Sequence, residues 1–162
     1  MPRNDNVEIL ENVRIMHRNF AGKEGMYNQE GDRNFSVIID DRTAKRLAND
    51  GWNVKWRPPY EEGDPETPYL PVSVKYRGRG GKELRPPRIV MITSRGRNPL
   101  SENEVEILDW ADIVTCDMII RPHEWEMNGK SGTKAYLQSM FVTIEEDPLE
   151  LKYSGVNDAP GS

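Results

Sequence analysis

The sequence predicts a mainly β fold, and three observations support this. Short runs of alternating apolar and polar residues recur along the chain, as in half-buried strands. Glycine, proline, asparagine and aspartate cluster between these runs, as tight turns require. Only two stretches space their apolar residues as a helix does, and both are short. The pattern therefore indicates a small antiparallel barrel with two short helices.

The first two strands are expected to form a long hairpin. Residues 7–19 alternate in part, and residues 35–39 alternate before an acidic pair ends the run. The loop between them contains three glycines and is framed by the near repeat Arg-Asn-Phe at residues 18–20 and 33–35. Glycine permits backbone angles that other residues avoid, arginine contacts phosphate, and an aromatic ring stacks on a base. The loop is therefore a candidate for gripping nucleic acid, although a glycine loop without a ligand would look similar.

The middle of the chain continues with a helix and three strands. Residues 41–50 have helical spacing, with an aspartate to cap the start and Gly51 to end it. Residues 52–56 and 69–76 alternate as strands, and the proline-rich, acidic segment between them is predicted to be a solvated loop. Residues 88–93 form another short strand after a Gly/Arg-rich turn.

The last part of the core is predicted to be a second helix and a second hairpin. Ser101 followed by Glu104 is a capping-box pattern, which predicts a short packing helix. Residues 112–125 and 135–144 have strand character, and the Asn-Gly pair at 128–129 between them is a strong hairpin signal.

The length of 162 residues and the mass of 18.6 kDa fit one domain that can bury a core without disulfides or metals. We expect residues 1–147 to form a single Greek-key, OB-like nucleic-acid-binding domain and residues 148–162 to form a flexible polar C-terminal tail. In such barrels the loop after the first strand and the loop between the last two strands flank the oligonucleotide groove. Here these are residues 20–32 and 127–134, and both carry glycine and lysine.

The composition indicates a cytoplasmic protein. The single cysteine, Cys116, can make neither an internal disulfide nor a thiolate metal cluster, which favours a reducing compartment. The sequence shows no charged-then-apolar leader and no apolar run near the roughly 20 residues of a membrane span. We therefore expect no membrane association.

The charge is distributed unevenly along the chain. The formal net charge is -5, but residues 75–97 contain eight Lys and Arg residues and one Glu, a net +7, so the rest carries -12. A local positive field can hold phosphates on an acidic protein. A merely solvated charged face is the alternative interpretation.

Two sets of residues are predicted to contact nucleic acid. Cations in the two loops and in the basic segment are candidates for phosphate contacts: Arg18, Lys23, Arg33, Arg77, Arg79, Lys82, Lys130 and Lys134. Aromatic residues beside glycine or arginine or near a strand end are candidates for base stacking: Phe20, Tyr27, Tyr76 and Trp125. Trp52 and Trp56 alternate with polar residues, which favours core packing for at least one of them.

The sequence gives little support for catalysis. His17 and His123 are the only histidines, and neither has a metal-ligating partner two to four residues away. The acidic pairs look like a helix cap and the start of the tail, so two-metal nuclease chemistry is a weak alternative. We therefore predict no enzymatic activity, no catalytic residues, no metal and no cofactor.

Five segments together resemble a family of small phage-encoded single-stranded DNA-binding proteins. They are residues 18–35, 50–54, 121–125, 128–132 and 134–137, and the likeness covers roughly residues 7–147. The resemblance implies an OB-like fold, no catalysis, and a role in phage DNA replication or recombination in the cytoplasm of the host bacterium. It also makes replication or recombination proteins possible partners.

The sequence-based hypothesis is thus a sequence-tolerant single-stranded DNA-binding protein that uses phosphate contacts and base stacking. RNA is not excluded, since discrimination depends on groove geometry. A homodimer could form if an edge strand pairs across chains. The rival hypothesis is a phage protein-interaction module that binds a host or replisome protein through the proline-rich loop at 57–71 or the arginine-rich insert.

Overall fold

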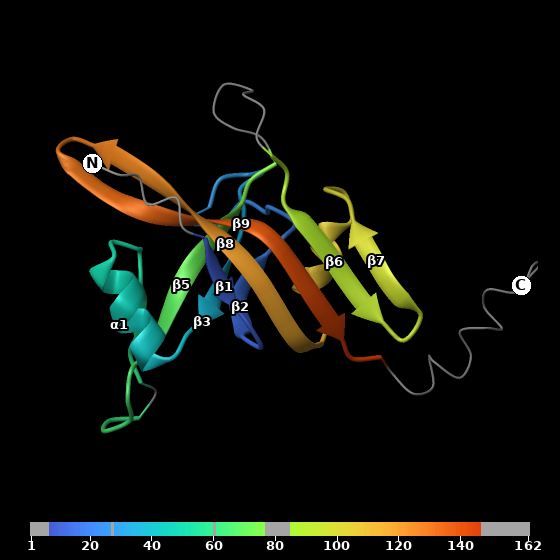
Figure 1. The fold of residues 1–162 in the computed structure, drawn as a ribbon, viewed down its shortest axis with the longest axis horizontal. Coiled ribbons are helices and arrows are strands. Elements are labelled where there is room, and N and C mark those ends of the chain that lie inside the picture. Colours follow the sequence, from blue (N-terminus) through green and yellow to red (C-terminus); the bar gives the residue numbers. More distant parts are fainter. Residues whose placement is uncertain (1–6, 27, 60, 77–84, 147–162) are drawn as a thin grey trace, which may run out of the picture.

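The computed structural model describes residues 7–26, 28–59, 61–76 and 85–146. Within these ranges the chain forms β-strands, one α-helix and one 3-10 helix, η2 (Figure 1). In chain order the elements are β1 (Glu8–Leu10), β2 (Arg14–Asn19), β3 (Arg33–Ile38), α1 (Asp41–Asn49), β4 (Lys55–Arg57), β5 (Thr67–Val74), β6 (Arg88–Thr93), β7 (Gly96–Leu100), η2 (Val105–Asp109), β8 (Ile113–Met127) and β9 (Lys130–Ile144). The mainly β class is confirmed.

The strands form one mixed sheet in the order β1-β8-β9-β5-β3-β2, with β4 on β5 and β6 between β9 and β7. Most pairings are antiparallel, but β9 runs parallel to both β5 and β6. The predicted antiparallel arrangement therefore holds for most pairings, but not for these two. The physical reason is the connections: β9 reaches β5 and β6 through long connections, which allow parallel pairing, whereas its tight hairpin with β8 is antiparallel.

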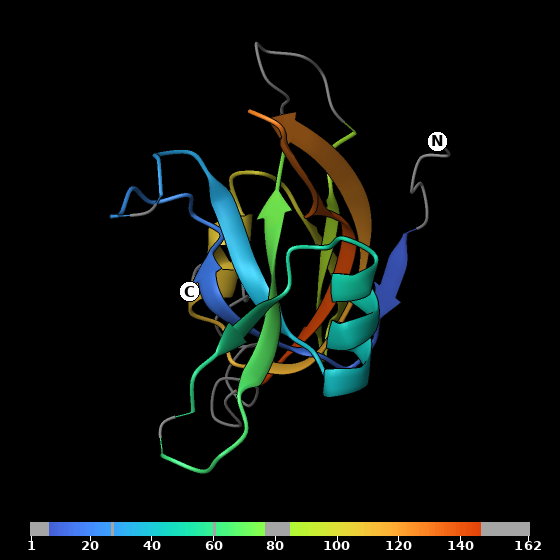
Figure 2. The same cartoon turned by 90° about the vertical axis from the view of Figure 1, so that its left-hand side faces the viewer.

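The predicted first strand is broken into β1 and β2, and the break curls the sheet. β1 pairs with β8, whereas β2 pairs with β3 at the other end of the strand order. Between them Asn12 has a φ of 50° and donates its backbone N–H to Asp117 Oδ1 at 2.7 Å. The N–H of Val13 then donates to the carbonyl of Cys116 at 2.9 Å. The hydrogen-bonded path stays open, but its two ends are consecutive in the chain, so the sheet wraps around its core (Figure 2).

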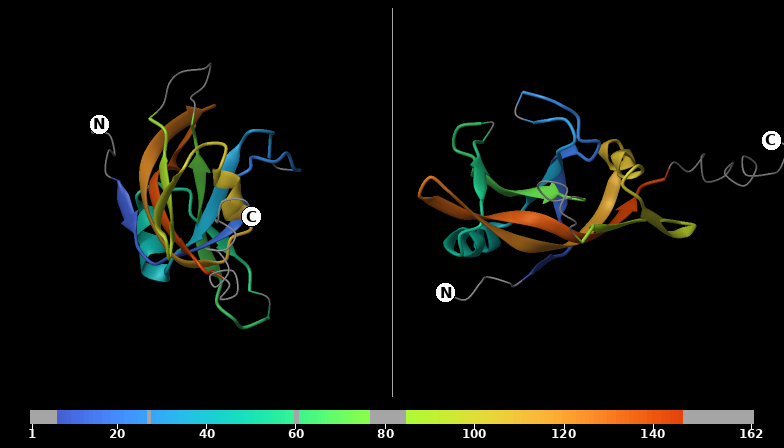
Figure 3. Two further views of the ribbon diagram at one scale, coloured as in Figure 1. Left: turned by 90° about the vertical axis from the view of Figure 1, so that its right-hand side faces the viewer. Right: turned by 90° about the horizontal axis from the view of Figure 1, so that it is seen from above.

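Both predicted helices are present. Asp40 caps α1 by accepting hydrogen bonds from the backbone N–H and the hydroxyl of Thr43, and these bonds lower the pKa of its carboxyl. The second helix is the 3-10 helix η2, and Glu104 accepts the backbone N–H of Ser101 at 2.9 Å as the capping-box pattern predicts. The two helices lie at opposite ends of the molecule (Figure 3).

The core lies between the two helices. Alternating residues of the sheet point into it, among them Phe35, Val37, Leu70, Val72, Met140 and Val142, all with at most 1% of their surface exposed. Leu47 of α1 and Leu108 of η2 are also fully buried and belong to the same cluster. Each helix thus covers one part of the core with an apolar side chain.

The strand β7 was not expected. Four of its five residues are exposed, so the segment has no apolar alternation that could mark a strand. It pairs with β6 alone among the described strands, and a proline at position 99 is tolerated at such an edge. The predicted strand at 52–56 is shorter than expected: Trp52 is buried and forms an isolated bridge to Thr133, and regular pairing begins at Lys55.

The hairpin of β8 and β9 is the longest feature of the fold and extends beyond the rest of the sheet (Figure 1). Each strand has 15 residues, and their pairing runs to the final pair Met127 and Lys130. Asn128 and Gly129 join them with φ values of 54° and 77°, the left-handed angles of a type I′ turn. The predicted Asn-Gly hairpin is therefore confirmed.

Candidate nucleic-acid interface

One side of the sheet carries the polar and aromatic residues of β5 and its neighbours. Along β5 every second residue is buried, and Tyr69, Pro71 and Ser73 lie between the buried positions. Directly paired residues of neighbouring strands point to the same side. Asn34 and Ser36 of β3, which pair with Ser73 and Pro71, therefore share this side. We call it the outward side of the sheet.

The outward side continues from β5 onto β9, because Ser73 pairs with Tyr136. The antiparallel register of β8 and β9 then brings further alternating side chains to the same side. Together these side chains form what we call the hairpin face: Arg121, His123, Trp125, Lys134 and Tyr136.

Three aromatic rings are held in fixed positions on the hairpin face. The ring of His123 stacks on that of Tyr136, with a centroid separation of 4.4 Å and an interplanar angle of 8°. Trp125 lies against Gly132, where a Cβ atom would come within 3.0 Å of Trp125 Nε1, so glycine leaves room for the indole. Tyr136 and Trp125 are both half-buried, and His123 is exposed. Each ring is supported by the hairpin and still reaches solvent.

Positive charge surrounds these rings. The guanidinium carbon of Arg121 lies 5.8 Å from the Tyr136 ring centroid, and Lys134 pairs with His123 across the hairpin. Burial lowers the pKa of His123 below its usual 6.5, and Lys134, Arg121 and Lys75 lower it further. His123 is therefore mainly neutral at pH 7. A row of stacked rings with cations beside it can hold bases and phosphates at once.

A second aromatic pair lies further along the outward side. The rings of His17 and Tyr69 meet edge to face at a centroid separation of 5.4 Å. His17 Nδ1 is 3.2 Å from the hydroxyl oxygen of Ser36. A register shift between Met16 and Asn19, with a φ of 52° at His17, turns this side chain to the side of Ser36. The outward side thus carries aromatic rings from β2 to β8.

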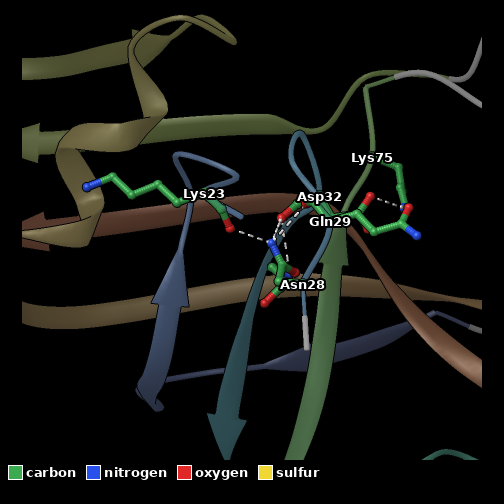
Figure 4. A network of polar contacts seen from close by, with 6 residues as sticks. Lys23, Asn28, Gln29, Asp32 and Lys75 are labelled. Carbon is green, nitrogen blue, oxygen red and sulfur yellow. Dashed lines mark hydrogen bonds and ion pairs between the residues drawn. The ribbon is translucent and has the colours of Figure 1, made fainter. Parts of the chain in front are cut away.

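Hydrogen bonds within the loop between β2 and β3 stabilise its conformation (Figure 4). The side-chain amide of Asn28 donates to three carbonyl oxygens, those of Lys23, Gln29 and Asp32, at 2.8, 3.1 and 3.0 Å. Asn34 of β3 donates to Asn28 Oδ1 at 2.7 Å, which ties the loop to the outward side of the sheet. The loop that the glycines predict is thus a fixed structure that satisfies many of its own polar groups.

The two arginines that frame this loop have structural partners. Arg18 donates to the carbonyl oxygens of Leu108 and Ala111 at 2.9 and 2.7 Å, beside η2. Arg33 lies 3.9 Å from a carboxylate oxygen of Glu102, and only 18% of its side chain is exposed. Both arginines therefore hold β2 and β3 against residues 101–111. The predicted phosphate contacts by Arg18 and Arg33 would have to compete with these interactions.

The stacking prediction for Phe20 is wrong. Its ring is fully buried and stacks on Phe35 at a centroid separation of 5.1 Å, so no base can reach it. Its backbone N–H donates to Asp109 Oδ1 at 2.7 Å, which holds this residue beneath η2. Tyr76 is half-buried and packs against the core, with Arg33 5.8 Å from its ring centroid. Burial raises the pKa of Tyr76, whose hydroxyl has no hydrogen-bond partner within the described residues.

The other predicted site residues fall into three groups. Trp125 and Lys134 lie together on the hairpin face, and Lys130 is exposed at the tip of the same hairpin. Lys23 is exposed on the loop, with its Nζ atom 5.6 Å from the Trp110 ring centroid. Four residues lie outside the described ranges and remain predictions: Tyr27, Arg77, Arg79 and Lys82.

The basic segment also places two arginines on the outward side of β9. The guanidinium carbons of Arg88 and Arg97 lie 5.7 and 5.8 Å from the ring centroid of Phe141. Phe141 sits between the buried residues Met140 and Val142, so it points outward as Tyr136 does. The described part of the segment therefore gathers cations around an aromatic ring and does not simply present a solvated face.

A comparison with known protein families shows which family the chain belongs to. Residues 2–161 match a family described as the phage ssDNA-binding domain. The chain belongs to this family. The resemblance expected from the sequence is thereby confirmed, since this family is described as a phage ssDNA-binding domain.

Solved structures support the fold of this phage ssDNA-binding domain. The single-stranded DNA-binding protein from bacteriophage Enc34 in complex with ssDNA is 13% identical, with a TM-score of 0.55 and 88% of each chain covered. A C-terminal truncation of the Enc34 protein is 14% identical, with a TM-score of 0.53 and 88% of each chain covered. No curated protein sequence matches the chain. At these identities the likeness concerns the fold, which is that of OB-like ssDNA-binding proteins.

Other site chemistry has little basis in the described part of this phage ssDNA-binding domain. In those ranges no group of three or more His, Cys, Asp or Glu residues could hold a metal ion. Burial raises the pKa of the Cys116 thiol to about 12, which keeps it protonated and unreactive. No helix of the described chain is both long and apolar enough to traverse a bilayer.

Sequence reasoning missed several residues of the outward side in this domain. Tyr69, Arg121, His123 and Tyr136 were not among the predicted site residues. The alternation of the strands could have indicated them. Tyr69 is next to the inward-facing Leu70 and so faces outward, and Arg121 and His123 alternate with residues that face the other way. Loop residues were favoured because they flank the groove of the fold class, although the strands themselves carry more of the exposed rings.

Proposed function

We propose that this chain binds single-stranded DNA on its outward side, with the hairpin face as the main contact surface. The observation that carries the proposal is the stacked pair of His123 and Tyr136, with Trp125 on the same face and Arg121 and Lys134 among the rings. Each stacked base contributes about 1 to 3 kcal/mol, and the cations contribute through phosphate contacts.

Binding of this kind tolerates any sequence, because every base has a face that can stack on an aromatic ring. The rings of the hairpin face are fixed before DNA arrives: Tyr136 by His123, and Trp125 by the close approach to Gly132. Fixed rings lose little conformational entropy on binding. We therefore expect affinity for thymine and adenine oligonucleotides to differ only modestly.

The proposal includes a non-catalytic role in phage DNA replication or recombination, in the cytoplasm of the host. A single binding domain through residue 147, followed by a polar tail at 148–162, completes the proposed organisation. The tail lies outside the described residues. Replication or recombination proteins are the proposed protein partners. Homodimer formation and binding to RNA also remain open to test.

The proposal is tested by titrating a labelled thymine oligonucleotide with the protein and following fluorescence anisotropy at two salt concentrations. We expect tight binding that weakens with salt, because cations are released from the DNA. The matched duplex tests whether the protein prefers single strands. Single-stranded RNA tests whether it distinguishes deoxyribose from ribose. If single-stranded DNA does not bind even at low salt, the proposal fails, and the alternative hypothesis of a protein-interaction module is favoured.

A further inference from the structure

A tryptophan outside the hairpin face has the features of an additional base-binding position. Trp110 directly follows η2 and has 64% of its surface exposed. Tryptophan is usually largely buried, since its ring has a large apolar area. Its ring is accompanied by a cation, because Lys23 Nζ lies 5.6 Å from the ring centroid.

Hydrogen bonds to the residues on either side of Trp110 hold its backbone in place. The N–H groups of Phe20 and Ala21 donate to the two carboxylate oxygens of Asp109 at 2.7 and 3.1 Å. Arg18 donates to the carbonyls of Leu108 and Ala111, on either side of Trp110. The neighbouring backbone is thus held to the start of the loop while the indole stays exposed. An exposed ring on a firmly held backbone is suited to stacking.

The same loop connects Trp110 to the outward side of the sheet. Lys23 is joined to Asn28 through its backbone carbonyl, and Asn28 accepts a hydrogen bond from Asn34 on β3. Asn34 pairs with Ser73, and Ser73 pairs with Tyr136 of the hairpin face. A chain of hydrogen bonds and strand pairings therefore connects the hairpin face, through β5 and β3, to the loop whose Lys23 lies beside Trp110.

We propose that Trp110 and Lys23 form a second base-stacking and phosphate-contacting position for the same DNA strand, beyond the loop from the hairpin face. This inference rests on the proposed function. Lys23 supplies the charge that complements a phosphate, and the indole supplies the stacking surface. The distance from β9 to β2 is roughly 15 Å, from about 4.8 Å between neighbouring strands. Trp110 lies beyond β2, whose Arg18 binds the carbonyls on either side of it, so a probe must extend further than this distance to fill both positions.

The test compares Trp110→Ala, Trp110→Phe and the wild type in anisotropy titrations. The probes are thymine oligonucleotides from about 4 to about 16 nucleotides long, the range of site sizes for single OB folds. For the longest probe we expect Trp110→Ala to lower the affinity about tenfold and Trp110→Phe to retain most of it. The loss should shrink as the probe shortens and reaches only the hairpin face.

The matched control is Ile107→Ala, which removes an exposed apolar side chain of η2 itself and should leave binding unchanged. Thermal unfolding of each variant verifies that it is folded. Wild-type affinity of Trp110→Ala at every length would overturn the inference while leaving the proposed function intact. Equal losses of DNA affinity in Trp110→Ala and Ile107→Ala would also overturn it, because the DNA would then contact exposed apolar side chains without stacking on the indole. Absence of binding by the wild type would instead remove the proposed function itself.

Discussion

The loop at residues 20–32 and the hairpin of β8 and β9 both border the outward side, yet they use the same residue types differently. In the loop region the aromatic residue Phe20 is buried and the arginines 18 and 33 bind protein groups. On the hairpin the rings of Tyr136 and Trp125 reach solvent, and Lys134 is exposed. Phe20, Arg18 and Arg33 thus stabilise the fold around the loop, whereas the hairpin presents its aromatic and cationic side chains to solvent.

The difference follows from how each region is supported. The loop leaves the sheet and must satisfy its own backbone, which it does through Asn28 and through Asp109 of η2. The backbone of the hairpin is satisfied by the ladder between its two strands, so its outward side chains are not needed for that purpose. A regular two-stranded ladder therefore leaves side chains available for a ligand.

The largest expected effect is on stability, from Phe20→Ala. Removing a fully buried ring that stacks on Phe35 should lower the free energy of unfolding by about 3 to 5 kcal/mol. The affinity for single-stranded DNA should stay near wild type under conditions where the variant is folded. Urea unfolding measures the first quantity and anisotropy the second, with Phe20→Leu as the milder control. A folded variant with greatly reduced affinity would place Phe20 in the site after all.

Arg18→Ala should be the next largest change, again in stability. The variant loses two hydrogen bonds from a charged donor to the carbonyls of Leu108 and Ala111, which should cost about 1.5 to 3 kcal/mol in all. Arg14→Ala, at an exposed position of the same strand, is the matched control and should cost much less. Urea unfolding of both variants measures the difference. Similar stabilities for the two would contradict the structural role assigned to Arg18.

On the hairpin, Tyr136→Ala should lower DNA affinity by about 1 to 3 kcal/mol, because it removes one stacking surface and the support for His123. Tyr136→Phe keeps the ring and should retain most of the affinity. Anisotropy titration with one thymine oligonucleotide measures both variants. The expectation is contradicted if the alanine variant binds as tightly as the phenylalanine variant.

Lys134→Ala should have a smaller effect that depends on salt. Loss of one phosphate contact reduces the slope of log affinity against log salt by about 0.7 for single-stranded DNA. The stability should change little, because Lys134 is exposed. Titrations at four or more salt concentrations would give the slope. An unchanged slope would exclude Lys134 from the phosphate contacts.

The smallest expected effect is the pH dependence through His123. Its pKa in the free protein is lowered from 6.5, so the unfolded chain binds this proton more readily, and His123 reduces stability as pH falls below 6.5. Bound phosphates favour the charged imidazole, so DNA affinity should rise modestly between pH 7.5 and pH 5.5. His123→Gln should remove part of that rise. An identical pH profile for wild type and His123→Gln would contradict this.

Local patterns allowed accurate prediction where neighbours in sequence determine structure. The capped helix α1, the strand β6 at residues 88–93 and the Asn-Gly turn all depend on nearby residues, and all are confirmed. For these features the alternation and turn chemistry of a short segment were sufficient. Lys130 and Lys134 are exposed and Trp125 is half-buried, and their contacts with nucleic acid remain predictions.

Features that depend on distant partners could not be predicted in this way. The break at Asn12 exists because Asp117 and Cys116 of β8 bind the chain there, and no local pattern marks it. The register shift at His17 reverses which residues face outward, and it makes simple alternation misleading for Arg18. Phe20 looked exposed beside the glycines because the covering η2 lies about 90 residues further along the sequence.

The most direct test of the account is to map where single-stranded DNA touches the protein by photo-crosslinking. Oligonucleotides carrying 5-iodouracil at successive positions would be irradiated with the protein, and the crosslinked peptides identified by mass spectrometry. The account predicts crosslinks at Tyr136 and Trp125 of the hairpin face. Trp56 serves as the internal control, since it is 39% exposed but pairs with the buried Pro68, away from the outward side. Crosslinks concentrated at Trp56, with none at Tyr136 or Trp125, would contradict the central claim.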